Sequence, residues 1–376
     1  MNDRNPLRPS GPAGVLLLPR LRVQNANAVS GPLTWGFPAL SAFLGFAHAL
    51  ERRLAASHGV AFEGVGIVCH GFDPQVFTPN RRRHLVFTQS RNPVYLKRDA
   101  AKFVADGTPP AIVEEGKAHL EVSLVLGVRQ HGFIEALEGQ LFAEAAGQAA
   151  LGMRLAGGSI LPAKPRWQAH WLDWPESRNE QRRAFARLRR RLLPGFALVH
   201  RPDLLAERLA ALQAEAHGAG LLDALLHLSG LNHVPVPPVE TAPPVPVAEG
   251  EAGAGPGPQA VKEVTKEATK EATKVAWDVE RRPGWLVPLP VGYAGLSPLH
   301  GPGEVGGARD DATPLRFVES LYSLGQWLGP HRLGCLEQLL WHSTADPLAG
   351  LYRCTNHYVD HVDTLAGAGE TTMQGA

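Results

Sequence analysis

A group of uncharged polar side chains follows the first apolar segment of the chain and could bind an unpaired nucleic-acid strand. The stretch PRLRVQNANAVSGPLTWGF (19–37) contains Gln24, Asn25, Asn27 and Ser30. Amides and hydroxyls bond both base edges and phosphate oxygens, Arg20 and Arg22 can contact phosphates, and Trp35 offers a flat face for base stacking. The alternative is a polar loop whose amides cap a helix and close a turn, with Trp35 packed in the core.

Positive charge is concentrated in two parts of the chain, although the formal net charge is only +1. Residues 1–100 hold 12 Lys and Arg against five Asp and Glu, and residues 178–201 hold eight Arg against one Glu. Residues 301–376 show the reverse, with four basic and nine acidic side chains. This distribution favours a polyanionic partner with a limited footprint; the alternative is a solvated surface that only keeps the protein soluble.

Three other places could contact such a partner. The basic arm RRRHLVFTQSRNPVYLKR (81–98) holds Arg91 and Asn92 between aromatic residues. The turn Gly157-Gly158-Ser159, preceded by Arg154, could let a phosphate approach the main chain, although an ordinary helix C-cap explains the glycines at least as well. A helix predicted over 176–193 exposes Arg182, Arg183, Arg187 and Arg190.

Enzyme and metal signatures are absent from the sequence. It has no GxxxxGK[ST], HExxH or GxSxG motif, and Cys69, Cys335 and Cys354 form no CxxC pair. We therefore predict no catalytic residue, metal or cofactor. His48 is the best-placed histidine for metal-independent ribonuclease chemistry, but its position beside an apolar stripe fits packing better. No apolar run reaches the roughly 18 residues of a membrane span, so a cytoplasmic protein without a membrane partner is expected.

The elements that must position these residues alternate between strand and helix patterns. Apolar alternation predicts strands at 15–23, 65–69, 120–126, 159–161 and 195–199. The 3.6-residue period predicts helices at 38–54 and 133–155. Together they predict an α+β core over residues 14–200, interrupted at about 71–116 by the basic arm.

The remaining chain is predicted to divide into four parts. Helices at about 203–217 and 221–230 form a helical region (201–233), and the Pro-rich and Thr-Lys-Glu-Ala-repeating stretch 234–275 is a disordered or frayed linker. The segment 276–360 begins with an extended strip at 277–298, laid across a surface. Helices at 314–328 and 330–341 then pack on the core, and 361–376 is an unstructured tail.

Long motifs in a fixed order resemble one protein family. They are the run 19–54, GVGIVCH (64–70), RNP (91–93), AIVEEGKAHLEVSLVLGV (111–128), MRLAGGSILP (153–162), RRLLPGFALV (190–199), PGWLVPLPVGY (283–293), TPLRFVESLYSLGQWLGPHR (313–332) and GLYR (350–353). The chain resembles the second Csy subunits, the Cas-five-type members of the type I-F CRISPR surveillance complex.

The resemblance implies a modified ferredoxin-like core of RNA-recognition-motif (RAMP) type, with a thumb-like hairpin insertion and an added helical region. It implies a non-catalytic subunit that caps the 5′ handle of the CRISPR RNA and pairs with the large Csy subunit. Backbone Csy subunits along the guide and target DNA are further partners that it implies. Some relatives in other CRISPR types cleave repeat RNA, so a metal-independent endoribonuclease is the alternative.

Overall fold

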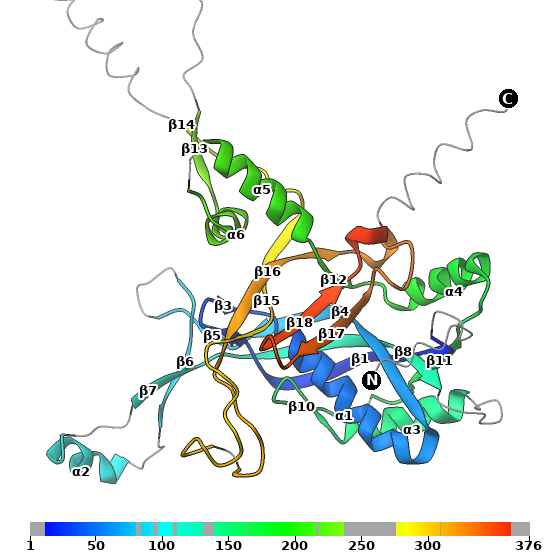
Figure 1. Cartoon of the computed structure of the whole chain (residues 1–376), viewed down its shortest axis with the longest axis horizontal. Helices are drawn as coiled ribbons and strands as arrows, with labels where there is room; N and C mark the ends of the chain where they lie inside the picture. The colour runs from blue at the N-terminus through cyan, green and yellow to red at the C-terminus, as the bar shows by residue number, and fades with distance from the viewer. Residues whose placement is uncertain are drawn as a thin grey trace, which may run out of the picture.

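An antiparallel sheet of eleven strands organises the chain (Figure 1). The computed structural model describes residues 12–79, 84–92, 97–107, 111–130, 139–162, 164–215, 218–236, 276–308 and 310–361. The strand order is β12-β16-β15-β18-β17-β4-β8-β1-β10-β9, with β11 (His170–Asp173) also paired to β1. Three large buried clusters lie against this sheet and the helices around it. The prediction of an α+β fold is confirmed.

The first half of the chain alternates between strands and helices, as predicted. Its main elements are β1 (Gly14–Asn27), α1 (Leu40–His58), β4 (Val60–Pro74), β8 (Lys117–Gln130), α3 (Gly139–Leu151) and β10 (Gly158–Ile160). The four strands lie side by side in the order β4-β8-β1-β10. Phe43 and Leu50 of α1 and Phe142 of α3 are buried in the same cluster as Leu18 and Leu124 of the sheet, so both helices cover one face.

The helix predicted over 133–155 ends earlier than expected. The described part of this helix, α3, ends at Leu151, and β9 (Arg154–Leu155) pairs with β10. The two residues between them, Ala156 and Gly157, have φ values of 50° and 75°. A two-residue turn with both φ angles positive matches the twist of a hairpin. Gly157 therefore lies in the turn between β9 and β10 and does not end a helix.

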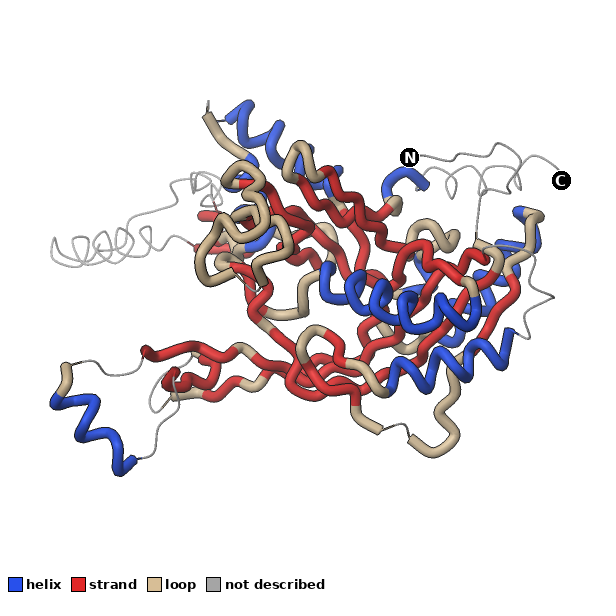
Figure 2. The backbone as a smooth tube through the Cα atoms, turned by 60° about the horizontal axis from the view of Figure 1, so that its bottom comes forward, coloured by secondary structure: helices blue, strands red, loops and turns tan. Residues whose placement is uncertain are grey.

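The basic arm projects from the body of the molecule (Figure 2). It consists of β5 (Val76–Phe77), β6 (Val86–Asn92) and β7 (Ala111–Glu115), which form a separate three-stranded sheet. The short helices η1 (Lys97–Asp99) and α2 (Ala100–Ala105) lie at its far end. The sequence had located this insertion between two strands of the core, and the structure places it between β4 and β8.

Five strands from the second half of the chain form a closed ring with β4. They are β12 (Phe196–His200), β15 (Trp285–Gly295), β16 (Val318–Leu328), β17 (Leu340–Asp346) and β18 (Leu351–Asn356). Because β12 pairs with both β16 and β4, and β17 also pairs with β4, these five strands and β4 form a closed ring of antiparallel pairs. Trp341 is fully buried inside it and donates a hydrogen bond from Nε1 to the carbonyl of Leu198 at 2.8 Å.

The prediction of two carboxyl-terminal helices, over 314–328 and 330–341, is wrong. The first segment is mostly strand β16, and the second contains only the short 3-10 helix η2 (Pro330–Arg332) before β17 begins. Six consecutive residues of β16, from 323 to 328, are buried, because both faces of the strand are covered: Leu324 packs with Leu205 and Leu225, and Trp327 lies in the cluster that contains Phe43. The strip predicted to lie across a surface, 277–298, instead supplies the sheet strand β15.

The two helices predicted at about 203–217 and 221–230 are present as α5 (Pro202–Glu215) and α6 (Leu221–Ser229). Directly after α6, β13 (His233–Val236) pairs with β14 (Ala276–Val279), so the first residues of the predicted linker form a strand. The rest of that linker and the tail from residue 362 onward lie outside the described residues. Among the helices that the structure describes, none is long and apolar enough to cross a membrane.

Candidate nucleic-acid interface

The exit of β1 presents basic and polar side chains on the sheet face opposite α1 and α3. Leu21 and Val23 point into the core beneath these helices, and strand side chains alternate between faces. Arg22 and Gln24 therefore lie on the other face. We call this surface the open face; it comprises Arg20, Arg22, Gln24, His70, His119, Glu121 and Ser123. The far end of the same face is covered by α4 (Arg178–Arg191), whose Phe185 packs there.

Two β-bulges shape the exit of β1. Register shifts occur between Leu18 and Leu21 and between Val23 and Ala26. Arg20 and Asn25 lie within them with φ values of 45° and 58°. Bulges redirect side chains and are frequent next to functional sites. These two residues therefore depart from the regular strand within the segment that the sequence marked as binding.

Hydrogen bonds on the open face join β1, β4 and β8. The Arg20 guanidinium donates to Glu121 at 2.8 Å and to the Pro194 carbonyl at 3.2 Å. This bond from Arg20 holds the pKa of the Glu121 carboxyl below its ordinary value. His70 donates from Nδ1 to the same carbonyl at 2.6 Å, since a carbonyl can only accept, and its Nε2 lies 2.7 Å from the Ser123 hydroxyl. Burial lowers the pKa of His70, which favours the neutral ring.

Asn25 and Gln24 differ in how free their side chains are. The Asn25 side-chain oxygen accepts a hydrogen bond from Gln75, and its main-chain N–H donates to His119 Nδ1 at 3.3 Å. Gln24 is exposed, and its backbone pairs with that of Ser159 across β10. The amide of Gln24 is therefore available to a ligand, whereas half of the Asn25 amide is already used.

Asn27 and Ser30 stabilise the loop itself. Asn27 donates to the carbonyl of Val29 at 2.8 Å and accepts from the Val29 N–H at 3.2 Å. The Ser30 hydroxyl donates to the carbonyl of Phe37 at 2.9 Å. These contacts match the polar-loop alternative that the sequence left open for these two residues, while their predicted contact with RNA stays a prediction.

Trp35 does not belong to the core. It lies in β3 (Thr34–Trp35), which pairs with β2 (Val29–Gly31), and its side chain is 62% exposed. One edge meets Phe87 at the base of the arm, with ring centroids 5.2 Å apart. Trp35 also borders a cavity of about 280 Å³ that is lined mainly by aromatic and apolar side chains, including Trp285. The placement leaves the ring available for stacking.

The hairpin at 154–159 lies directly beside β1. Ser159 faces Gln24, and Arg154, its partner on β9, donates from Nε to the carbonyl of Gly157 at 3.1 Å. At Gly158 an added Cβ would lie 2.7 Å from the carbonyl oxygen of Gln24, so only glycine fits this approach of two main chains. The structure thus brings Arg154, Gly157, Gly158 and Ser159 next to the exit of β1.

The predicted arm residues lie farther out. Arg91 and Asn92 pair with Ile112 and Ala111 near the end of β6. Their side chains lie outside the described residues, so their contacts with RNA stay predictions.

Helix α4 carries the predicted arginine face. Arg182, Arg183, Arg187 and Arg190 are exposed, and within the described residues none has a hydrogen-bond or ion-pair partner. Arg189 differs, because its guanidinium donates to the carbonyl of Leu333 at 2.6 Å and lies 5.6 Å from the Phe185 ring. The first four are therefore free to meet an anion, and the fifth fixes the helix.

His48 lies on another surface. It borders a groove of about 580 Å³ together with His342, His357 and His361. Glu51, Glu63 and Glu337 line the same groove. Among the described residues that line it, the one arginine, Arg129, is paired with Glu63. Within the described part of the chain, no group of three or more His, Cys, Asp or Glu side chains is arranged to hold a metal ion.

Sequence reasoning missed several members of the interface. His70, Gln75, His119 and Glu121 were not among the predicted site residues, although they contact Arg20 or Asn25 directly or through Ser123. The signal was the alternation in KAHLEVS (117–123), where every second residue is polar. These positions identify a strand with one polar face, and their partners on β1 lie about 100 residues away in sequence.

Comparison with known proteins agrees with the resemblance seen in the motifs. The family model described as CRISPR-associated protein (Cas_Csy2) matches residues 16–354. A relative from Pseudomonas aeruginosa (strain UCBPP-PA14), named CRISPR-associated protein Csy2, is 47% identical over 355 residues. The match covers 93% of this chain and 98% of the relative. The chain therefore belongs to the Csy2 family of CRISPR-associated proteins.

Proposed function

We propose that the chain is a non-catalytic subunit of a type I-F CRISPR surveillance complex and holds the 5′ handle of the guide RNA. The observation that carries this proposal is the set of side chains at the exit of β1. There Arg22 and Gln24 lie on the open face beside the Ser159 hairpin, and the loop that follows β1 carries the exposed ring of Trp35. Unpaired RNA is bound through stacking, base-edge hydrogen bonds and phosphate contacts, and the β1 exit with its following loop offers groups for all three.

The strand order supports a ferredoxin-like, Cas-five-type core. In the sequence β1-α1-β4-β8-α3-β10, the first strand lies between the third and the fourth, and both helices cover one face. This is the arrangement of an RNA-recognition motif, which binds RNA on the face that its helices leave free. The projecting arm corresponds to the thumb-like hairpin of the proposal.

The partners of the proposal are the large Csy subunit, the backbone Csy subunits and target DNA. The exposed arginines of α4 and the exposed apolar side chains of α6 are candidate contacts. Three leucines of α6, Leu221, Leu222 and Leu226, are each more than half exposed. An apolar helix face of this kind suits a protein partner, whereas unpaired arginines suit a phosphate backbone.

The alternative, a metal-independent endoribonuclease that uses His48, is disfavoured by the charge of its groove. Three carboxylates and one paired arginine line it, and a polyanion is repelled from such a surface. The histidines there could move protons, but the one arginine among the described lining residues, Arg129, is already paired with Glu63.

Binding of a synthetic 5′-handle RNA to the full chain tests the proposal. We expect salt-sensitive binding that weakens at least tenfold when Gln24→Ala and Ser159→Ala are combined. Gln148→Ala, an exposed glutamine on α3, is the matched control and should leave affinity unchanged. Wild-type protein that does not bind the RNA, or a double variant that binds it normally, would contradict the proposal.

CRISPR repeat RNA incubated with the protein in EDTA separates the two functions. We expect intact RNA. A defined product that disappears in His48→Ala would establish the endoribonuclease instead.

A further inference from the structure

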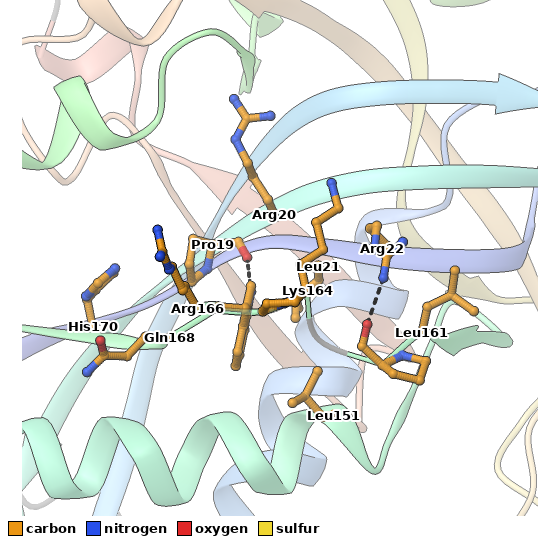
Figure 3. A pocket seen from close by; sticks show the side chains of 13 residues that line it. Pro19, Arg20, Leu21, Arg22, Leu151, Leu161, Lys164, Arg166, Gln168 and His170 are labelled. Atoms are coloured by element: carbon orange, nitrogen blue, oxygen red, sulfur yellow. Dashed lines mark hydrogen bonds between the residues drawn. The ribbon is translucent and has the colours of Figure 1, made fainter.

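We propose that a cavity between the first bulge of β1 and residues 161–162 and 164–168 binds a phosphodiester group of the guide RNA that leaves the β1 exit. This inference rests on the proposed function, and it names a second contact point for the RNA backbone. The cavity is shown in Figure 3 and is about 270 Å³ in volume. Its basic lining residues are Arg20, Arg22, Lys164, Arg166 and His170.

The cavity is held open by hydrogen bonds between its two walls. Trp167 donates from Nε1 to the carbonyl of Pro19 at 2.5 Å, and Arg22 donates to the carbonyl of Pro162 at 2.8 Å (Figure 3). The main-chain N–H of Leu161 also donates to the carbonyl of Arg22 at 2.8 Å. Residues 161–162 and 167 are thus attached to β1 at both ends of the cavity, so a ligand would meet a site that is already formed.

Both walls contain an arginine in the left-handed region. The described residues include only four non-glycine residues with positive φ, namely Arg20, Asn25, Ala156 and Arg166. All four lie in β1 or in the segments paired or bonded to it, and Arg20 and Arg166 line this cavity. Such strained backbone is often found at binding sites. Here it places two guanidinium groups at one cavity.

The balance of charge leaves positive groups free for an anion. No carboxylate is among the described residues that line the cavity. Two acids that contact lining residues are already engaged: Glu121 pairs with Arg20, and Glu144 accepts a hydrogen bond from Gln168 at 3.5 Å.

Lys164 and Arg166 are the two unpaired cations of the cavity. Both are exposed, and within the described residues neither has a hydrogen-bond or ion-pair partner. Hydrogen bonding from Arg20 and, to a smaller extent, the positive charge of Lys164 lower the pKa of Glu121, so Lys164 lies near the open face. These two side chains are therefore the ones that we expect to meet the phosphate.

The cavity continues the predicted path of the RNA. Arg22 borders the cavity, and Gln24 lies two residues farther along the same strand, on the same face. Alternate residues of a strand are about 6.6–6.8 Å apart. This distance is comparable to one nucleotide step of an extended single strand, so a backbone that passes Gln24 can reach the cavity without leaving the sheet.

The test compares variants of the full chain in titrations with 5′-handle RNA at several salt concentrations. We expect Lys164→Ala combined with Arg166→Ala to weaken binding about tenfold at 0.1 M salt. If each side chain neutralises one phosphate, the slope of log affinity against log salt should fall by about 1.4. An unrelated RNA of equal length should show the same change in slope, because phosphate contacts carry no sequence information. Lys164→Arg should retain wild-type binding.

Arg52→Ala is the matched control, because Arg52 is exposed on α1, on the opposite side of the sheet, and should change neither affinity nor slope. Unchanged RNA affinity and slope in the Lys164 and Arg166 double variant would overturn the inference. If the loss is confined to duplex DNA while RNA binding is intact, the inference is likewise overturned. In both cases a loss of RNA binding in the Gln24 and Ser159 double variant would leave the proposed function standing.

Discussion

Trp35 meets Phe87 edge to face, with ring centroids 5.2 Å apart and planes at 87°. Trp35 belongs to the loop after β1, and Phe87 is a buried residue at the base of the arm. The main chain reinforces this contact, since the N–H of Ala28 donates to the carbonyl of Gly116 at 2.9 Å. The loop and the arm, which are about 50 residues apart in sequence, therefore form one continuous surface.

Replacement of Trp35 should affect RNA binding more than stability. We expect Trp35→Ala to lose about 1–3 kcal/mol of RNA binding free energy, because one stacking face disappears, while Trp35→Phe should retain most of it. Trp277→Ala is the control, since Trp277 is equally exposed (62%) but lies on β14. RNA titration measures the effect, and equal losses in the two alanine variants would contradict a specific role for Trp35.

Gly158 should tolerate no side chain. A Cβ there would lie 2.7 Å from the Gln24 oxygen and 2.8 Å from the Ala26 nitrogen, and neither main-chain atom can move without disturbing β1. We expect Gly158→Ala to lower the free energy of unfolding by about 1–3 kcal/mol. Chemical denaturation measures this.

Gly45→Ala provides the comparison for Gly158→Ala. Gly45 lies within α1, and a Cβ there would meet no atom within 4 Å. This substitution should raise the free energy of unfolding by about 0.5–1 kcal/mol, because alanine favours a helix. Equal stability of the two variants would show that the approach of β10 to β1 does not require glycine.

The sequence predicted the first half of the fold because its elements carry clear periods. Leu40, Phe43 and Leu50 share one helix face, and every second residue of β8 is apolar. These patterns arise because the apolar face of each element packs into the cluster between the sheet and the helices α1 and α3.

The second half could not be predicted in this way. In β16, Leu321, Leu324 and Leu328 repeat at helical spacing, but the segment pairs with β12 and β15 as a strand. Six successive residues are buried because elements pack on both of its faces. Tertiary contacts override local preference in such a strand. Contacts between distant parts of the chain also limited the prediction of the site. Arg20 was predicted to contact a phosphate, whereas its guanidinium donates a hydrogen bond to Glu121, 101 residues later.

Replacement of the exposed arginines of α4 should weaken nucleic-acid binding without changing stability. We expect Arg187→Ala combined with Arg190→Ala to change the free energy of unfolding by less than about 0.5 kcal/mol, because both side chains are exposed and unpaired within the described residues. The nucleic-acid affinity of the assembled complex should fall and become less sensitive to salt. If instead the affinity and its salt dependence stay unchanged, these arginines do not face nucleic acid.

Arg189→Ala should show the opposite behaviour. Its guanidinium joins α4 to the main chain at His331 and Leu333. We expect a loss of about 1–3 kcal/mol in the free energy of unfolding, because two carbonyls lose their donor. Thermal or chemical unfolding of the two α4 variants side by side distinguishes the roles.

Stability should fall in mild acid because several histidines are held neutral. Burial lowers the pKa of His200 to about 4, against an ordinary value of 6.5, and its Nε2 lies 2.9 Å from the Ser323 hydroxyl. Burial also lowers the pKa values of His70 and His342. Between the folded and unfolded pKa values the unfolded chain binds more protons, so the free energy of unfolding falls as pH drops below about 6.5.

Each such histidine contributes at most about 1.4 kcal/mol per pH unit in that window. Chemical denaturation at pH 7.5, 6.0 and 5.0 should show the decline, and His200→Gln should make it shallower, because glutamine keeps a polar contact but cannot take up a proton. His48→Gln, at an exposed position on α1, should retain the wild-type dependence on pH. A His200→Gln variant whose stability falls as steeply as that of the wild type would show that proton uptake at this ring does not oppose folding.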